Sequence, residues 1–101
     1  MSTSLEITGE IGRIVLTGSF DFLVQDDLRQ IIDKTLNSKK VKNISVDMAG
    51  VTFMDSSAIR LLLLLNKNAV AGGKSLVLVN CRNPLREIFA IGGFDTVLTI
   101  R

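Results

Sequence analysis

The second half of the sequence alternates segments of helical periodicity with short runs of aliphatic residues, and this alternation constrains the fold most. Two of its junctions are similar: "VAGGKSLVLVN" and "AIGGFDTVLTI" each contain a helix end, a pair of glycines and an apolar strand. Strands joined through helices in this way imply crossover connections between parallel strands that helices cover. The sequence therefore predicts an α/β fold.

The rest of the chain supplies the remaining elements. "SLEIT" and "RIVLTG" predict two short strands that form a hairpin, and apolar residues at helical spacing predict a helix over Leu23–Leu36. The later predicted elements are, in order, the strand Ile44–Met48, a leucine-rich helix ending before Gly72, the strand Ser75–Asn80, the helix Pro84–Ile91 and the strand Thr96–Ile100. The predicted order is β-β-α-β-α-β-α-β within one domain, residues 1–101.

Composition excludes several classes of function. The chain is 47% hydrophobic and 22% charged, which is typical of a packed globular domain. Its net charge is only +2, and its one basic cluster, Lys39–Lys42, has no aromatic residues between the cations, so we expect no direct nucleic-acid binding. Cys81 is the single cysteine, which rules out a disulfide within the chain and a Cys-rich metal site; we expect it to be buried or at a strand end.

Catalytic motifs are also missing. The chain has no histidine, which removes the commonest general base and most transition-metal sites. "GGKS", Gly72–Ser75, resembles the end of a phosphate-binding loop, but Asn68 stands where the first glycine belongs and a strand follows. We therefore predict a protein that is not an enzyme and that has no metal or cofactor.

The run of leucines is not expected to cross a membrane. A membrane span needs about 20 mostly apolar residues, whereas this run is bracketed by Arg60 and by Asn66–Asn68. The first ten residues show neither a basic start nor an apolar segment of the kind that a signal peptide has. We expect a cytoplasmic protein with no membrane contact.

The segment "FMDSSAIRLLLLL", Phe53–Leu65, places an acid and two serines at the start of the leucine-rich helix. Aspartate and serine are preferred helix caps, so one of Asp55, Ser56 and Ser57 is expected to accept a bond from a backbone N–H group. The start of a helix also suits a phosphoryl group, because its N–H groups and dipole stabilise an anion. These residues alone leave both roles open.

The two faces of this helix are predicted to differ. At 100° per residue, one stripe points inward, and it consists of Ala58, Leu61, Leu62, Leu65 and Ala69. The opposite side carries Ser56, Ser57, Arg60, Leu64 and Lys67. An exposed leucine in line with serines and a cation is either an ordinary surface residue or part of a surface for a partner.

The stretch "VDMAGVTFMDSSAIRLLLLL" resembles STAS domains, specifically bacterial anti-sigma factor antagonists. "LTGSFD", Leu16–Asp21, is similar to the "LTGELD" that opens this family, and "GGKSLVLVN" and "PLREIFAIGGFDTVLTI" are similar to its closing half. The resemblance covers nearly the whole chain. It implies a STAS-like domain with a small, mixed, mostly parallel sheet and with helices packed on one side.

The resemblance also implies a function in partner switching and transcription regulation. Such an antagonist binds a serine kinase that is also the anti-sigma factor; the kinase phosphorylates the first serine after the aspartate, here Ser56, and a serine phosphatase reverses the reaction. The motifs that carry the resemblance add Ser19, Asp21 and Asp55 as partner-binding residues, and the outer side of the leucine-rich helix supplies Ser57, Arg60 and Leu64. The family usually continues "DSSGLG", and this chain has Ala58 and Arg60 in place of the two glycines.

Two other functions stay open. One is a STAS module that is not phosphorylated and acts as a scaffold or as a subunit of a transport complex, which would need neither Ser56 nor Arg60. The other is an enzyme or a nucleotide binder, which the missing histidine and the incomplete phosphate loop disfavour.

Overall fold

The computed structural model describes residues 2–21 and 25–101, and its first two strands form an antiparallel hairpin. β1 (Ser2–Thr8) pairs with β2 (Ile11–Phe20), and Leu5 lies opposite Ile14. Gly9, in the turn, has a φ of 59°, in the left-handed region that glycine adopts without steric cost. The predicted hairpin is confirmed, and both strands extend further than the sequence pattern indicated.

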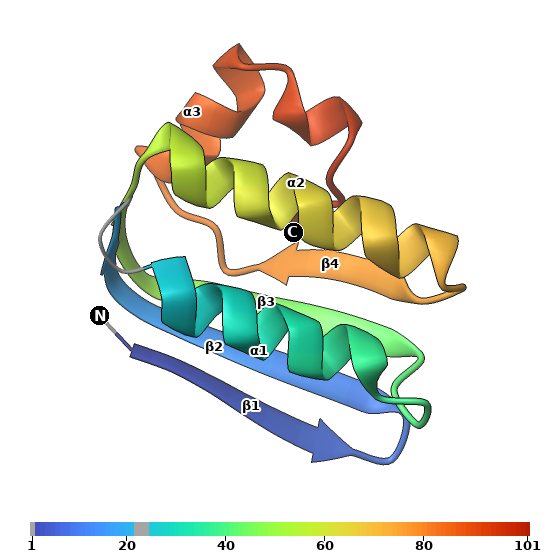
Figure 1. Cartoon of the computed structure of the whole chain (residues 1–101). Helices are drawn as coiled ribbons and strands as arrows, with labels where there is room; N and C mark the ends of the chain where they lie inside the picture. The colour runs from blue at the N-terminus through green and yellow to red at the C-terminus, as the bar shows by residue number, and fades with distance from the viewer. Residues whose placement is uncertain (1, 22–24) are drawn as a thin grey trace.

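The sheet continues with parallel strands that are connected by helices. The elements after β2 are, in order, α1 (Gln25–Asn37), β3 (Asn43–Met54), α2 (Ser56–Ala71) and β4 (Ser75–Val79). The strand order is β1-β2-β3-β4, and β3 pairs in parallel with both β2 and β4. Both α1 and α2 lie over the same face of the sheet (Figure 1). The predicted mostly parallel sheet with helices on one side is confirmed; Leu23 and Val24, the first residues of the predicted first helix, lie outside the described residues.

The chain ends with α3 (Leu85–Ile91), then a short 3-10 helix, η2 (Phe94–Thr96), and then an irregular segment. Figure 1 shows α3 and this final segment beside α2, beyond the β4 side of the sheet. The predicted helix over Pro84–Ile91 is confirmed, with Pro84 in the capping position before the first helical residue.

The last predicted strand, Thr96–Ile100, is wrong over most of its length. The amides of Val97 and Leu98 donate to the carbonyl of Phe94, at 3.1 and 2.8 Å, which holds the start of the segment in a helical turn. Only Ile100 then pairs with the sheet, through an isolated bridge to Leu78 of β4.

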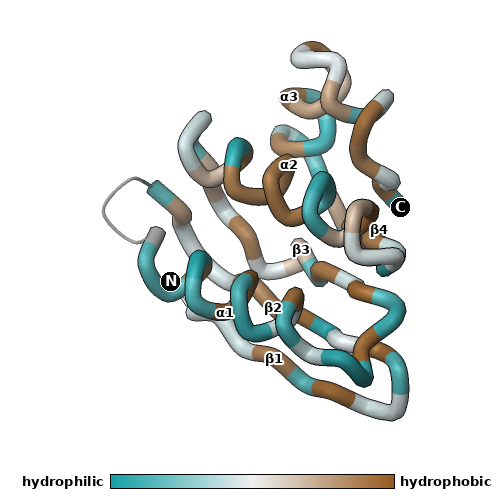
Figure 2. The backbone as a smooth tube through the Cα atoms, turned by 45° about the vertical axis from the view of Figure 1, so that its right-hand side comes forward, coloured by the Kyte–Doolittle hydropathy of each residue, from teal (hydrophilic) through white to brown (hydrophobic). Residues whose placement is uncertain are grey.

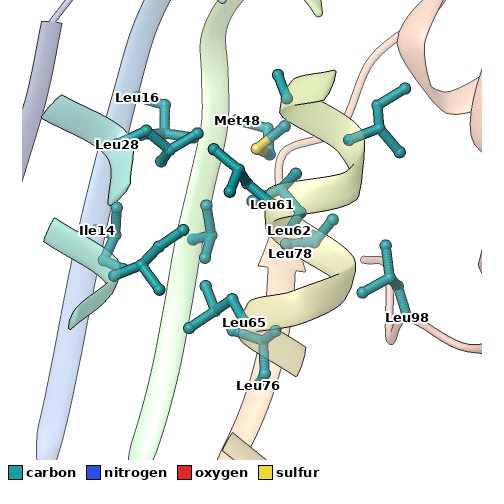
Figure 3. Close-up of a cluster of buried hydrophobic side chains, with 14 of the residues drawn as sticks. Ile14, Leu16, Leu28, Met48, Leu61, Leu62, Leu65, Leu76, Leu78 and Leu98 are labelled. Carbon is teal, nitrogen blue, oxygen red and sulfur yellow. The ribbon is translucent and has the colours of Figure 1, made fainter. Parts of the chain in front are cut away.

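The hydrophobic core fills the space between the covered face of the sheet and the two long helices (Figure 3). Leu61, Leu62 and Leu65 of α2 point toward the strands, and Leu28 comes from α1 (Figure 3). The buried hydrophobic residues of β2, β3 and β4 on this face are Ile14, Leu16, Phe20, Ile44, Val46, Met48, Met54, Leu76 and Leu78. Of the two helices, α2 carries the longer hydrophobic stretch (Figure 2). The sheet and α2 thus supply most of the apolar surface that stabilises the fold.

β3 is longer than predicted, and its second half positions the start of α2. The predicted strand ended at Met48, whereas the observed one runs to Met54 through two irregularities in its pairing with β2. Gly50 allows β3 to pack closely against Thr17 of β2, because a Cβ atom at position 50 would lie 2.7 Å from Cγ2 of Thr17. The carboxyl ends of β2 and β3 therefore meet, with Phe20 paired to Met54.

The uncovered face of the sheet holds a buried carboxylate, Asp47. Its oxygens accept bonds from the guanidinium of Arg13 at 2.6 Å, the amide of Ala49 at 3.0 Å and Nδ2 of Asn80 at 3.1 Å. The Ala49 bond first, then those of Asn80 and Arg13, lower the pKa of Asp47 against the opposing effect of burial. Asp47 thus joins β2, β3 and the end of β4.

Candidate partner-binding site

Asp55 forms the cap of α2. Its backbone is extended, with φ −84° and ψ 176°, and its Oδ1 atom accepts a bond from the amide of Ala58 at 2.9 Å. Its own amide donates to the carbonyl of Phe20 at 3.0 Å, which ties the helix start to the end of β2. The prediction that one of three residues caps this helix is confirmed, and the capping residue is Asp55.

The two serines that follow have different environments. Ser56 is the first residue of α2 and is exposed, whereas Ser57 is half-buried. An enzyme that modifies a hydroxyl group needs room around it, so Ser56 is the more accessible acceptor of the two.

The two predicted faces of α2 are confirmed for nearly every residue. All five residues of the predicted inward stripe are buried, and Ser56, Arg60, Leu64 and Lys67 on the opposite side are exposed. Leu64 is 45% exposed, although Leu63 before it is half-buried and Leu65 after it is buried. Ile59 is also buried, although it is not part of the predicted inward stripe. It is buried because it faces α3 and the segment after α3.

The other predicted residues come from the end of β2, and the strand pairing brings them beside the start of α2. Ser19 is exposed and pairs with Phe53 of β3, and Asp21 follows β2 in a half-buried position. Phe53 is 53% exposed and was not predicted from the sequence as a partner-binding residue. Extension of the strand to Met54 would have indicated it, because Met54 points into the core and successive side chains of a strand point to opposite faces.

A hydrophobic groove lies between the first half of α2 and the α3–η2 segment. Its volume is about 500 Å³. The residues that line it are Met54, Ser56, Ile59, Arg60, Leu63, Ile88 and Phe94. Ile88 is 43% exposed, and Ile91, one turn further along α3, is 82% exposed. Apolar surface therefore continues from the groove over α3, which was not predicted from the sequence.

These residues lie around the start of α2 and along its outer face, and we call them the Ser56 surface: the ends of β2 and β3, the outer face of α2 and the groove. Leu64 lies two helical turns, about 12 Å, along the axis from Ser56. The surface combines accessible hydroxyls, the cations Arg60 and Lys67 on α2 and several apolar side chains. This mixture of exposed apolar and charged groups is typical of a protein-binding surface rather than of a catalytic centre.

Other chemistry finds little support in the described ranges, 2–21 and 25–101. They contain no group of three or more acidic, cysteine or histidine side chains that could hold a metal ion. Within them, no helix is long and apolar enough to span a membrane. Cys81 is buried, as predicted, and burial raises the pKa of its thiol, which disfavours the reactive thiolate.

Comparison with known proteins identifies the family. The family model described as "Mlab, STAS domain" matches residues 3–100. A STAS-domain containing protein of Pseudomonas aeruginosa is 32% identical over 87 residues, which cover 86% of this chain and 84% of that protein.

Two solved structures of an anti-sigma factor antagonist are similar to this chain over 99% of its length. The anti-sigma factor antagonist SpoIIAA in its unphosphorylated form is 25% identical, with a TM-score of 0.82, over 99% of this chain and 88% of that chain. The phosphorylated form of SpoIIAA, from Bacillus, gives a TM-score of 0.77 at the same identity and covers 99% of this chain and 91% of that one.

The same fold also occurs in part of a much larger protein. A structure of the murine anion transporter Solute Carrier 26 family member A9 is 23% identical, with a TM-score of 0.74, over 87% of this chain but only 14% of the transporter chain. At that identity the likeness concerns the fold alone. The family match over residues 3–100 and the 32% identity to the Pseudomonas protein show that this chain belongs to the STAS domain family.

Proposed function

We propose that this protein is an anti-sigma factor antagonist in a partner-switching pathway, regulated by reversible phosphorylation of Ser56. The observation that carries the proposal is the position of Ser56: it is exposed, it follows the capping aspartate, and it lines an apolar groove. The likeness to both forms of SpoIIAA supports the same role.

The proposed partner is a serine kinase that is also an anti-sigma factor, and it binds over the Ser56 surface. Phe53, Leu64 and Ile88 offer exposed apolar area, and Arg60 offers a cation among them. Ser19, Asp21 and Ser57 lie beside the helix start and complete a polar rim. An apolar centre with a polar rim is the usual composition of a protein interface.

Phosphorylation would oppose this complex through charge and hydration. A phosphate on Ser56 adds about −1.5 to −2 charges next to the carboxylate of Asp55, and an interface without matching donors would have to desolvate both. The domain itself should tolerate the group, because Ser56 is exposed and takes no part in the cap. Phosphorylation of Ser56 would therefore shift the equilibrium from the complex to the free protein.

In this proposal a separate serine phosphatase removes the phosphate and restores binding. The protein acts as a cytoplasmic regulator of transcription without being an enzyme itself, and it contacts neither nucleic acid nor membrane directly. It needs no cofactor.

A second function keeps the fold but not the switch. The murine transporter shows that a STAS fold occurs within a transport protein, and the family model carries the description "Mlab". In this alternative the chain is a scaffold or a subunit of a transport complex, and Ser56 is never modified.

The test is capture of partners from native lysate, followed by mass spectrometry of this chain and of the captured proteins. We expect a serine kinase among the partners and phosphate on Ser56 when that kinase and ATP are added. Ser56→Ala is the matched control and should bind the kinase but stay unmodified. Phosphate on Ser57 only, or none with the kinase present, would overturn the assignment of Ser56.

A further inference from the structure

Arg60 is the cation of α2 that lines the groove with Ser56, and its surroundings leave its charge available. The side chain is exposed, and among residues 2–21 and 25–101 no ion pair or hydrogen bond involves its guanidinium. It lines the groove together with Ser56, and no acidic residue lines that groove. Its charge is therefore not neutralised within the described structure.

Helix geometry directs this side chain toward Ser56. Residues four apart on a helix are neighbours, with about 5–6 Å between their Cβ atoms. Side chains on a helix also lean toward its amino-terminal end, so an arginine covers the turn that precedes its own Cα atom. Arg60, four residues after Ser56, therefore reaches the hydroxyl of Ser56 without any change in the backbone.

We infer that Arg60 is the intramolecular partner of the Ser56 phosphate. The inference rests on the proposed function, which supplies the modification: the γ-phosphoryl group of ATP is transferred to Oγ of Ser56, the hydroxyl proton is lost and ADP leaves. The guanidinium then pairs with the new phosphate oxygens, for which its planar, multiply donating shape is well suited.

This pairing changes the surface that a partner meets. Before phosphorylation, the guanidinium lies at the rim of the groove, where it can meet a carboxylate of the partner. After phosphorylation, it turns to the phosphate, and the groove loses its cation at the same time as it gains an anion. The switch therefore reverses the local charge rather than only adding bulk.

The test uses the full chain with phosphoserine incorporated directly at position 56, so it does not depend on any kinase. The second pKa of a phosphoserine lies near 6 and falls when a cation is beside it, and ³¹P NMR follows it during a pH titration. At low ionic strength we expect this pKa to be about 0.3–0.7 lower in the wild type than in Arg60→Gln. Arg60→Lys should keep part of the difference, because lysine retains the charge but not the forked geometry.

Lys67→Gln is the matched control. It removes one positive charge from the same face of α2, but about 16 Å along the axis from Ser56, where screening is substantial. It should leave the phosphate pKa unchanged, and amide spectra of every variant should show the folded domain. Equal pKa values in the wild type and Arg60→Gln would overturn the inference, and so would an equally large change in Lys67→Gln. A lowered pKa together with absence of phosphate on Ser56 in cells would instead refute the proposed function.

Discussion

The inner and outer faces of α2 are built partly from the same residue type, yet their environments are opposite. Leu61 is 6% exposed and lies in the core, whereas Leu64, three residues later, is 45% exposed on the outer face (Figure 3 shows the inner face). The contribution of a leucine in this helix to stability or to binding therefore depends on its position around the helix axis, and not on its hydrophobicity alone. The same substitution on the two faces should change different properties.

The largest effect is expected on the inner face. Leu61→Ala should lower the free energy of unfolding by about 2–5 kcal/mol, because it removes buried methyl groups and leaves a cavity. Leu64→Ala, the same change on the outer face, should cost no more than about 0.5 kcal/mol. Urea unfolding of both variants measures the difference, and equal losses would mean that the two faces do not differ as described.

The next effect concerns binding and is expected on the outer face. Leu64→Asp or Arg60→Glu should weaken the proposed complex with a serine kinase by about 10-fold or more, equal to about 1.4 kcal/mol, while the stability of the domain stays nearly unchanged. Val70→Asp is the control, since Val70 is 64% exposed on the same helix but fourteen residues after Ser56 and not in the lining of the groove. If Leu64→Asp unfolds the domain, the assignment of the faces is wrong.

A smaller loss of stability than that of Leu61→Ala is expected at Asp55, the amino-terminal cap of α2. Asp55→Ala should cost about 1 kcal/mol, because it removes the hydrogen bond that the amide of Ala58 donates to Oδ1 of Asp55. Asp55→Asn should restore most of this loss, since asparagine caps helices equally well. Thermal unfolding of the two variants tests the role of the cap apart from the charge.

The smallest effect is expected on the uncovered face of the sheet, and it concerns the pH dependence of stability. The pKa of Asp47 is lowered in the folded state from its ordinary value of 3.8, chiefly by the Ala49 bond. Its contribution to stability is therefore complete above pH 3.8 and is lost as the pH falls through the lower folded-state value. Urea unfolding at about pH 5 and about pH 3 should show a smaller acid-induced loss in Asp47→Asn than in the wild type. Substitutions on α2 should leave this pH dependence unchanged.

The fold could be predicted from local sequence because its strands and helices each carry a clear period. Alternation in Ile11–Phe20 and helical spacing in α2 each agree with the observed burial. The last strand was predicted wrongly, because "TVLTI" has the composition of a strand while the bonds from Val97 and Leu98 to Phe94 begin it as a turn. The composition of that segment could not reveal these bonds.

Within the candidate site, the exposed residues of α2 could be predicted from the sequence, whereas the groove and Phe53 could not. Spacing on α2 placed Ser56, Arg60 and Leu64 on one side, and the structure has them there. The groove depends on how α3 and Phe94 pack against α2, and no local pattern indicates that packing. Phe53 was missed because the second half of β3 was not recognised as a strand.

The central claim, that the state of Ser56 controls binding of the partner, is tested most directly by calorimetry against the isolated serine kinase. The proteins to compare are the wild type, Ser56→Ala and Ser56→Asp. We expect Ser56→Ala to bind as tightly as the unphosphorylated wild type and Ser56→Asp to bind about 10-fold more weakly or worse, because a negative charge would have to be desolvated next to Asp55. Equal affinity for all three proteins would contradict the claim and leave Ser56 as an ordinary first residue of α2.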